Sequence, residues 1–227
     1  MLAPEATDVR IAIASSEPKV ARHALAERLF HWILAASFLT LLISAFGPIF
    51  GWRFDWVPLH VGAGIVLIFA VLLHLWRALF SLDFWSMMID RADLRNVLRG
   101  LVSVVEGRGP LPGKPAKYEV GQKLFHWGIA GLVLVLIATG LLMLAKLDTP
   151  FWQRNPYWLS EFTWGIIYTI HDLFAVLAVA MIILHLYFVL RPHTIFLLRS
   201  MVTGWITRRE YLDDFDPQRW RPEELKE

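Results

Sequence analysis

Four long apolar runs divide the 227-residue chain, and polar stretches separate them. The runs cover residues 29–51, 57–76, 124–145 and 173–190. None of them contains Lys, Arg, Asp or Glu, and each approaches the roughly 20 apolar residues that a helix needs to cross a bilayer. The pattern predicts an all-α membrane protein with four transmembrane helices. We expect the fourth helix to begin earlier than its apolar run, near residues 163–170.

Shorter patterns lie between and after these runs. Arg alternates with Leu and Val at helical spacing over residues 93–105, which predicts a helix lying in the membrane interface. Gly and Pro are frequent over residues 107–117 and predict turns there. The apolar stretch 194–206 contains Arg199 and predicts a second interfacial helix.

The chain therefore divides into one membrane domain with polar fringes. Residues 28–190 hold the four predicted transmembrane helices. Residues 1–27 form a predicted cytoplasmic lead-in, for which the sequence indicates no element. Residues 191–227 form a predicted cytoplasmic segment that contains the second interfacial helix and a charged tail. We expect the end of that tail, residues 208–227, to become ordered only against a partner.

Lysine and arginine are distributed unevenly among the polar stretches. Most of them lie before the first run, in the connection 77–123, and after residue 190, whereas the other two connections contain only Arg53, Lys146 and Arg154. Cytoplasmic loops of membrane proteins carry the excess of positive charge, so we predict that both termini face the cytoplasm. The isoelectric point of about 9.0 then reflects topology, and no nucleic-acid partner is expected.

The chain contains no cysteine. It can therefore form no disulfide, and it has no thiolate to hold zinc or an iron–sulfur cluster. Any metal chemistry has to use histidine. Six histidines lie inside or beside the predicted spans, namely His31, His60, His74, His126, His171 and His185.

The spacing of these histidines repeats. His171 and His185 are fourteen residues apart, and so are His60 and His74. Fourteen residues at a rise of about 1.5 Å place two side chains roughly 21 Å apart on nearly the same face of a helix. Such a helix offers a nitrogen ligand near each face of a hydrocarbon core about 30 Å thick, which suits two stacked haems.

An internal repeat accompanies this spacing. The tetrapeptide Leu-Phe-His-Trp occurs at residues 29–32 and again at 124–127, each time at the start of an odd-numbered span. The two even-numbered spans share the pattern of two histidines separated by thirteen residues. Two successive hairpins related by an axis along the membrane normal would give this arrangement.

The predicted topology sorts the histidines by depth. Only His60 and His171 fall on the outer side, on different helices, and they make one bis-histidine pair. The other four fall on the inner side, and the residues alone leave their pairing open. Two axial imidazoles make haem iron six-coordinate and suited to electron transfer. Hydrogen bonding across helices is the alternative role for a membrane histidine, but six histidines in two layers favour haem.

Several short motifs along the chain form a specific combination. They are Phe30-His31-Trp32, Leu59-His60 with Gly64 and Arg77, Lys117-Tyr118-Glu119-Val120-Gly121-Gln122-Lys123, the His171/His185 pair, and the basic tail with Arg208, Arg209, Pro217 and Trp220. Together they resemble the cytochrome b (gamma) subunit of membrane-bound respiratory formate dehydrogenase, from about residue 28 to residue 220. The resemblance implies a four-helix haem-binding bundle in the bacterial inner (cytoplasmic) membrane.

The resemblance also implies a set of cofactor ligands. It assigns one haem b to His60 and His171, as the sorting by depth does, and a second haem b to His31 and His185. The internal repeat instead gives His126 a ligand role. The residues that stay open as alternatives to His31 at the inner haem are His74 and His126.

A quinone site is a further implication of the resemblance. It would take menaquinone or ubiquinone near His185, beside the segment that contains Glu119, Gly121 and Gln122. At Glu119 the chain departs from the family, which commonly has Asn at this position. A protonated carboxyl can still bind a quinone oxygen or relay a proton, so we keep Glu119 among the expected site residues.

The implied activity is electron transfer within a larger complex. Electrons would come from an iron–sulfur (beta) subunit, and through it from a catalytic molybdenum or tungsten subunit. They would pass from the outer haem to the inner haem and then to quinone, with proton uptake on the cytoplasmic side. No dehydrogenase active site is expected in this chain.

Three alternatives remain open. The chain could instead serve a hydrogenase or a thiosulfate/polysulfide reductase as its cytochrome b subunit, since nothing in it contacts the primary substrate. A stand-alone cytochrome of the b561 type fits less well, because the basic tail and the aromatic outer loop resemble docking surfaces. A small proton-coupled transporter would use the histidines for protons and would bind no haem.

Overall fold

The computed structural model describes residues 18–80, 82–108 and 113–222, and these residues fall into two compact units. The membrane unit consists of Leu29–Trp85 and Gly121–Phe188. The second unit consists of the described parts of Met1–Arg28, Ser86–Val120 and Val189–Glu227. Each unit therefore combines segments that are far apart in the sequence.

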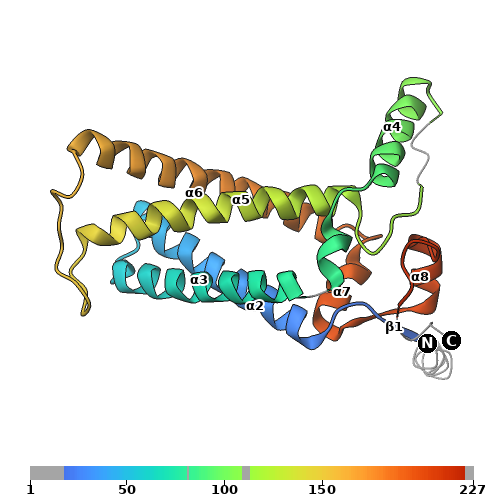
Figure 1. Ribbon diagram of the computed structural model, residues 1–227, viewed down its shortest axis with the longest axis horizontal. Helices are drawn as coiled ribbons and strands as arrows, with labels where there is room; N and C mark the ends of the chain where they lie inside the picture. The colour runs from blue at the N-terminus through green and yellow to red at the C-terminus, as the bar shows by residue number, and fades with distance from the viewer. Residues whose placement is uncertain (1–17, 81, 109–112, 223–227) are drawn as a thin grey trace, which may run out of the picture. The chain divides into compact units, whose positions relative to one another are not determined.

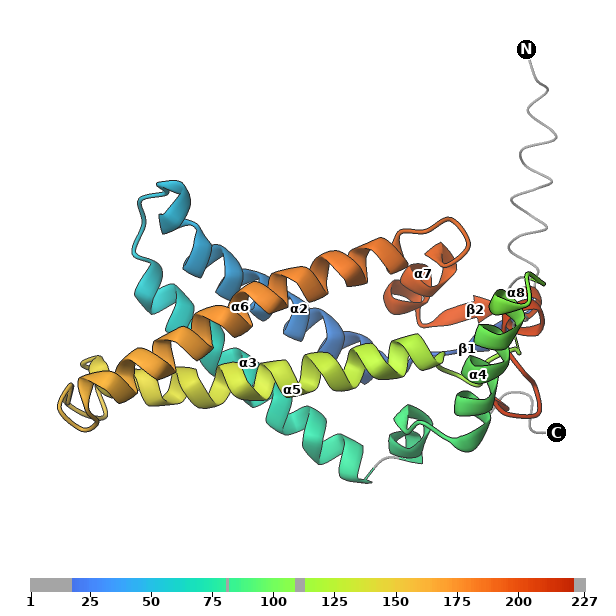
Figure 2. The same ribbon diagram turned by 90° about the horizontal axis from the view of Figure 1, so that it is seen from above.

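Four long helices build the membrane unit. They are α2 (Leu25–Phe46), α3 (Trp56–Phe80), α5 (Val120–Met143) and α6 (Glu161–Val189), and Figures 1 and 2 show them as the longest elements of the molecule. Short 3-10 helices, Pro48–Phe50 and Leu144–Lys146, extend α2 and α5. All four spans are long and apolar enough to cross a membrane. This confirms the predicted all-α fold with four transmembrane helices.

The boundary of the fourth helix differs from its apolar run. The helix α6 begins at Glu161, twelve residues before that run, and so slightly before the expected start near residues 163–170. Ser160 explains the start, because its hydroxyl accepts a hydrogen bond from the backbone N–H of Thr163 at 3.2 Å. A serine in this position satisfies one of the backbone donors that a helix leaves unpaired at its beginning.

The four helices present apolar side chains on most of their surface. Large exposed side chains such as Phe69, Leu73 and Ile183 are each more than half exposed. A helix that is hydrophobic on all sides is typical of a membrane span. In lipid the backbone must satisfy its own hydrogen bonds, and a continuous helix does so.

An apolar layer crosses the middle of the membrane unit. One residue from each helix contributes to it, namely Phe38, Leu67, Leu132 and Ala178. Leu67 lies seven residues from both histidines of α3, and Ala178 lies seven residues from both histidines of α6. The layer therefore separates the two histidine levels.

The second unit is built around a small antiparallel ribbon. Strand β1 (Lys19–Ala21) pairs with strand β2 (Trp205–Thr207), and Figure 2 shows the two strands side by side. Val20 lies opposite Ile206 in this pairing. The helices of this unit are α4 (Arg91–Val105), α7 (Ile195–Thr203) and α8 (Arg208–Asp214), and a 3-10 helix (Leu82–Met87) precedes α4. The buried side chains of Val20, Ile206, Tyr211 and Phe215 form its core.

Two expectations for the polar parts are confirmed in part. A helix does cover residues 93–105, as α4, while its position in a membrane interface stays a prediction. The helix expected at 194–206 ends at Thr203, because Gly204 adopts a left-handed conformation with φ of 96° and its N–H bonds to the carbonyl of Ser200. The next residues leave the helix as strand β2.

The expectation that the tail becomes ordered against a partner is wrong for most of its length. Residues 208–214 form α8, which Thr207 and Glu210 start with a reciprocal capping box. Tyr211 and Phe215 then pack into the core of the second unit. Similarly, residues 19–21 of the lead-in form β1, whereas residues 1–17 and 223–227 lie outside the described residues.

Candidate functional site

The six membrane histidines form three pairs of neighbouring rings. All six rings are half-buried among the helices of the membrane unit. The ring centres of His60 and His171 are 6.4 Å apart, at an angle of 65° between the planes. The other two pairs are His31 and His185, at 6.4 Å and 45°, and His74 and His126, at 5.9 Å and 61°.

The structure shows which of the inner histidines lie together, a point that depth alone left open. The structure brings together His60 of α3 and His171 of α6, the two histidines predicted to be alone on the outer side. At the other level it places His31 of α2 beside His185 of α6, which is the pair that the family resemblance implied. The two remaining histidines lie beside each other and not beside His185 in the described contacts.

The separations fit metal ligation from opposite sides. An imidazole nitrogen binds a metal at about 2 Å and lies about 1.1 Å from the centre of its own ring, so two such ligands in line place their ring centres about 6.3 Å apart. A direct hydrogen bond of about 2.9 Å between two imidazoles would place the centres about 5.1 Å apart. The two pairs at 6.4 Å match the first arrangement, and His74/His126 at 5.9 Å lies between the two.

Small residues leave space around the His60/His171 pair. Gly140 of α5 faces His171, and a Cβ atom added at Gly140 would lie only 3.4 Å from Cε1 of that ring. Gly62 lies two residues after His60, and a Cβ atom added there would have no other atom within 4 Å. The residues present therefore fit a flat macrocycle held between two histidines.

Two hydroxyl groups contact the same histidines, and the sequence patterns did not identify them. The hydroxyl of Ser44 on α2 lies 2.9 Å from Nδ1 of His60. The hydroxyl of Thr139 on α5 lies 2.8 Å from Nδ1 of His171. Each histidine of this pair is thus held by a side chain from the preceding helix in the chain.

Aromatic rings surround the other level in a repeated arrangement. Phe125 stacks on His185 with ring centres 5.0 Å apart, and Phe30 meets His74 edge-on at 6.4 Å. Both phenylalanines belong to the repeated tetrapeptide. The same two repeat positions are therefore in contact in both halves, although the rings meet face to face in one half and edge to face in the other.

The three expected quinone residues lie around the start of α5. Gly121 and Gln122 belong to its first turn, and Glu119 precedes the helix as an exposed residue of the second unit. Within that unit, burial lowers the pKa of Arg22 to about 10, while the charges of Tyr118 and Glu119 raise it. The negative charge of Glu119 therefore helps to keep the buried guanidinium of Arg22 protonated.

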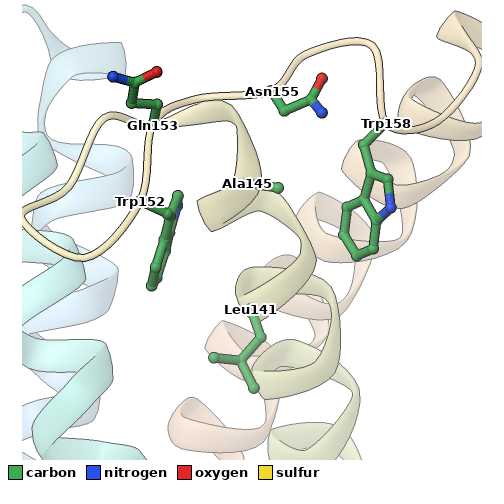
Figure 3. A pocket seen from close by; sticks show the side chains of 6 residues that line it. All are labelled: Leu141, Ala145, Trp152, Gln153, Asn155 and Trp158. Atoms are coloured by element: carbon green, nitrogen blue, oxygen red, sulfur yellow. The ribbon is translucent and has the colours of Figure 1, made fainter.

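Two cavities open in the membrane unit. The first, of about 310 Å³, lies at the end of α5 and has the indoles of Trp152 and Trp158 on either side of Ala145, as Figure 3 shows. Leu141 forms its apolar floor, and the amides at its rim are those of Gln153 and Asn155. The second cavity, of about 490 Å³, is lined by Phe30, Leu73, Trp76, Arg77 and Phe80, and its Phe30 also contacts His74.

Four long apolar helices with histidine rings paired between them form the arrangement expected of a membrane cytochrome of the b type. Residues 22–204 match the family model described as prokaryotic cytochrome b561, and the chain belongs to this family. Membership implies that the chain binds haem b. The chain is accordingly a multi-pass membrane protein.

Curated relatives give a narrower comparison. The cytochrome b556 subunit of formate dehydrogenase from Haemophilus influenzae is 23% identical over 222 residues, which cover 93% of this chain and 86% of the relative. The cytochrome b556(fdo) subunit of formate dehydrogenase from Escherichia coli is 24% identical and covers 83% of this chain and 86% of its own length. The nitrate-inducible b556(Fdn) subunit from the same species is 22% identical, covering 86% of this chain and 88% of itself. The resemblance inferred from the motifs is thus confirmed.

Proposed function

We propose that this chain is the di-haem cytochrome b subunit of a formate dehydrogenase complex in the bacterial inner membrane. His60 and His171 hold one haem b, and His31 and His185 hold the second. The observation that carries the proposal is the 6.4 Å separation of both pairs in a protein of the cytochrome b561 family. When bound, the two haems supply one-electron transfer between an iron–sulfur subunit and quinone.

The residues of the chain contribute orientation and the exclusion of water. The imidazoles of each pair come from different helices, so two nitrogen ligands would be available to a haem held between them. The apolar layer of Phe38, Leu67, Leu132 and Ala178 keeps water out of the space between the two levels. Residues 28–190 are the membrane domain that performs this task.

Partner subunits supply what this chain lacks. The curated relatives are named as subunits of formate dehydrogenase, and this chain has no cysteine with which to hold iron–sulfur clusters. An iron–sulfur (beta) subunit therefore delivers the electrons, and a catalytic molybdenum or tungsten subunit oxidises formate. We assign the outer loop with Trp152 and Trp158 to the docking of the iron–sulfur subunit, because indoles are frequent anchors of protein interfaces.

Quinone is the electron acceptor in this proposal. Menaquinone or ubiquinone binds near the start of α5, where Glu119, Gly121 and Gln122 provide a carboxyl group, an accessible backbone and an amide. Inward electron transfer with proton uptake on the cytoplasmic side contributes to the transmembrane potential. The variant Gln122→Leu in the assembled complex should slow quinone reduction while haem reduction by formate continues, and unchanged quinone reduction would remove Gln122 from the site.

A spectrum of the purified chain tests the central claim. We expect a reduced-minus-oxidised spectrum of the b type and about two haems per chain. His60→Ala should lower the content to about one, because a single remaining imidazole holds haem weakly. His193→Ala is the matched control, since His193 is exposed and lies outside the four spans. A folded wild-type chain without haem would contradict the proposal and favour a proton-coupled transporter.

The identity of the complex needs a separate measurement. Affinity purification of the chain from its native membrane should recover formate-dependent reduction of a dye together with the haem. Recovery of hydrogen-dependent or thiosulfate- or polysulfide-dependent activity instead would keep the cytochrome and replace the partner.

A further inference from the structure

We propose that Ser44 and Thr139 are positioning residues for the haem between His60 and His171. Each hydroxyl fixes the proton of its histidine on Nδ1 and turns the other ring nitrogen, Nε2, toward the iron. The inference deepens the proposed function and rests on it. It assigns a role to two residues outside the set of expected ligands.

The hydrogen bonds of Ser44 determine which atom is the donor. Its oxygen lies 2.7 Å from the carbonyl of Thr40 and 3.0 Å from the carbonyl of Leu41, as well as 2.9 Å from Nδ1 of His60. Carbonyl oxygens can only accept, and the hydroxyl has one hydrogen. If that hydrogen pointed to His60, the oxygens of Ser44 and Thr40 would face each other at 2.7 Å without a hydrogen between them. The hydroxyl therefore donates to its own helix and accepts the N–H of His60.

Thr139 repeats this arrangement on the other half of the membrane unit. Its hydroxyl lies 2.7 Å from the carbonyl of Val135, 3.2 Å from that of Leu136, and 2.8 Å from Nδ1 of His171. By the same argument, Thr139 donates to its helix and accepts the N–H of His171. Ser44 is fully buried and Thr139 is 8% exposed, so water offers no competing partner.

The consequence for the histidines is a defined tautomer. A neutral imidazole with its proton on Nδ1 has its lone pair on Nε2, and that lone pair is the metal ligand. An acceptor behind the ring also fixes the ring orientation and makes the ligand more basic. Both histidines of the pair thus meet the iron with the same nitrogen and the same kind of support.

The internal repeat provides independent support. Ser44 lies thirteen residues after His31, and Thr139 lies thirteen residues after His126, in the two copies of the tetrapeptide repeat. Each hydroxyl reaches the first histidine of the span that follows it. A hydroxyl at the same place in both halves, with the same bond to the same ring atom, indicates one function that both halves share.

The experiment compares variants that remove the hydroxyl with variants that keep it. Ser44→Ala and Thr139→Val remove the acceptor, whereas Ser44→Thr and Thr139→Ser retain it. Thr40→Val is the matched control, because the Thr40 hydroxyl is bonded only to its own helix in the described contacts, at 2.8 Å from the carbonyl of Ala36. The second half already has valine, Val135, at the position that corresponds to Thr40.

The readouts are the haem content of the purified full chain and the midpoint potential of each haem in a redox titration. Loss of the acceptor makes the imidazole a weaker donor to ferric iron, so the potential of this haem should rise while that of the other haem stays constant. Haem affinity should fall about tenfold, the lower end of the effect of such supporting residues. Ser44→Thr, Thr139→Ser and Thr40→Val should behave as the wild type.

Two different failures are distinguishable. A folded wild-type chain without haem would overturn the proposed function, and this inference with it. Two haems in the wild type, with content and both potentials unchanged in Ser44→Ala and Thr139→Val, would overturn only the role of the hydroxyls. A change in Ser44→Thr as large as in Ser44→Ala would indicate packing instead of hydrogen bonding, and would also overturn it.

Discussion

The proposed electron transfer depends on histidine ligands. At the inner level the internal repeat leaves two histidine pairs as possible haem ligands. The repeat relates His31 to His126 through the tetrapeptide, and His185 to His74 through the even-numbered spans. The pair His31/His185 and the pair His74/His126 are therefore equivalent under the repeat. Their geometry favours His31/His185 as the ligand pair, because 6.4 Å matches two ligands in line on one metal better than 5.9 Å does.

The first prediction concerns this choice. His31→Ala should lower the haem content from about two to about one per chain, whereas His126→Ala should leave it unchanged. The reason is that only the first substitution removes a ligand of the inner haem. Quantification of haem against protein, together with the reduced-minus-oxidised spectrum, measures both variants. Loss of haem in His126→Ala with retention in His31→Ala would move the inner site to His74 and His126.

Local sequence patterns predict one histidine pair of this site but not the hydroxyl groups that contact it. Depth along a helix follows from counting residues, so the sequence alone is enough to pair His60 with His171. It is not enough to identify the partners Ser44 and Thr139, because a hydroxyl in an apolar helix most often bonds to its own backbone. The repeat held a signal for them, since both lie thirteen residues after the histidine of the tetrapeptide.

At the scale of elements, the apolar runs predicted the spans, and the contacts between distant segments decided the rest. A run of about 20 apolar residues is a local property, and all four helices follow from it. The pairing of Lys19–Ala21 with Trp205–Thr207 joins the two ends of the chain. No local periodicity encodes such a pairing, and for this reason the sequence predicted an interfacial helix through residue 206.

The link between α4 and the C-terminal tail is an element-scale feature with a clear energetic consequence. The guanidinium of Arg219 donates hydrogen bonds to Asp90 at 2.9 Å and to Asp93 at 2.8 Å. Asp93 is 2% exposed and also caps α4 together with Asp90. A buried carboxylate that loses its cation destabilises a fold strongly.

The second prediction follows from this link. Arg219→Gln should destabilise the second unit by about 3 kcal/mol, because it removes the guanidinium that donates a hydrogen bond to the buried carboxylate of Asp93. Hydrogen exchange of α4 in the full chain measures the loss. Arg209→Gln is the control, since the 3.6 Å pair of Arg209 with Asp213 is exposed and should contribute less than about 1 kcal/mol. Equal protection of α4 in wild type and Arg219→Gln would show that the link does not hold the tail.

The same link makes the stability of the second unit depend on pH. Burial raises the pKa of Asp90, whereas hydrogen bonds from the backbone of Asp93 and from Arg219 lower it. The lowering outweighs the effect of burial, so the pKa lies below its ordinary value of 3.8. A carboxyl with a lowered pKa stabilises the folded state above that ordinary value and loses this contribution as the pH falls through the lowered one. Protection of α4 should therefore be constant near neutral pH and decrease only in acid.

At the scale of the whole molecule, the distribution of charge determines how the proposed function works. Electrons move inward and protons are taken up inside only if the outer loop faces the outside and the termini face the cytoplasm. The basic residues cluster before the first span, between the second and third, and after the fourth. By the positive-inside rule we expect these parts to be cytoplasmic, which would place the loop with Trp152 and Trp158 outside.

The third prediction tests this topology, and the absence of cysteine from the chain makes the test clean. Gln153 of the outer loop and Gln218 of the tail are both exposed glutamines, so Gln153→Cys and Gln218→Cys form a matched pair. In spheroplasts that express the chain without its partners, a membrane-impermeant maleimide should label only Gln153→Cys. Both variants should react after the membrane is permeabilised, and the wild type should react in neither case. Labelling of Gln218→Cys alone in intact spheroplasts would show the opposite orientation. The His60/His171 haem would then lie on the cytoplasmic side, where it could not receive electrons from an external iron–sulfur subunit.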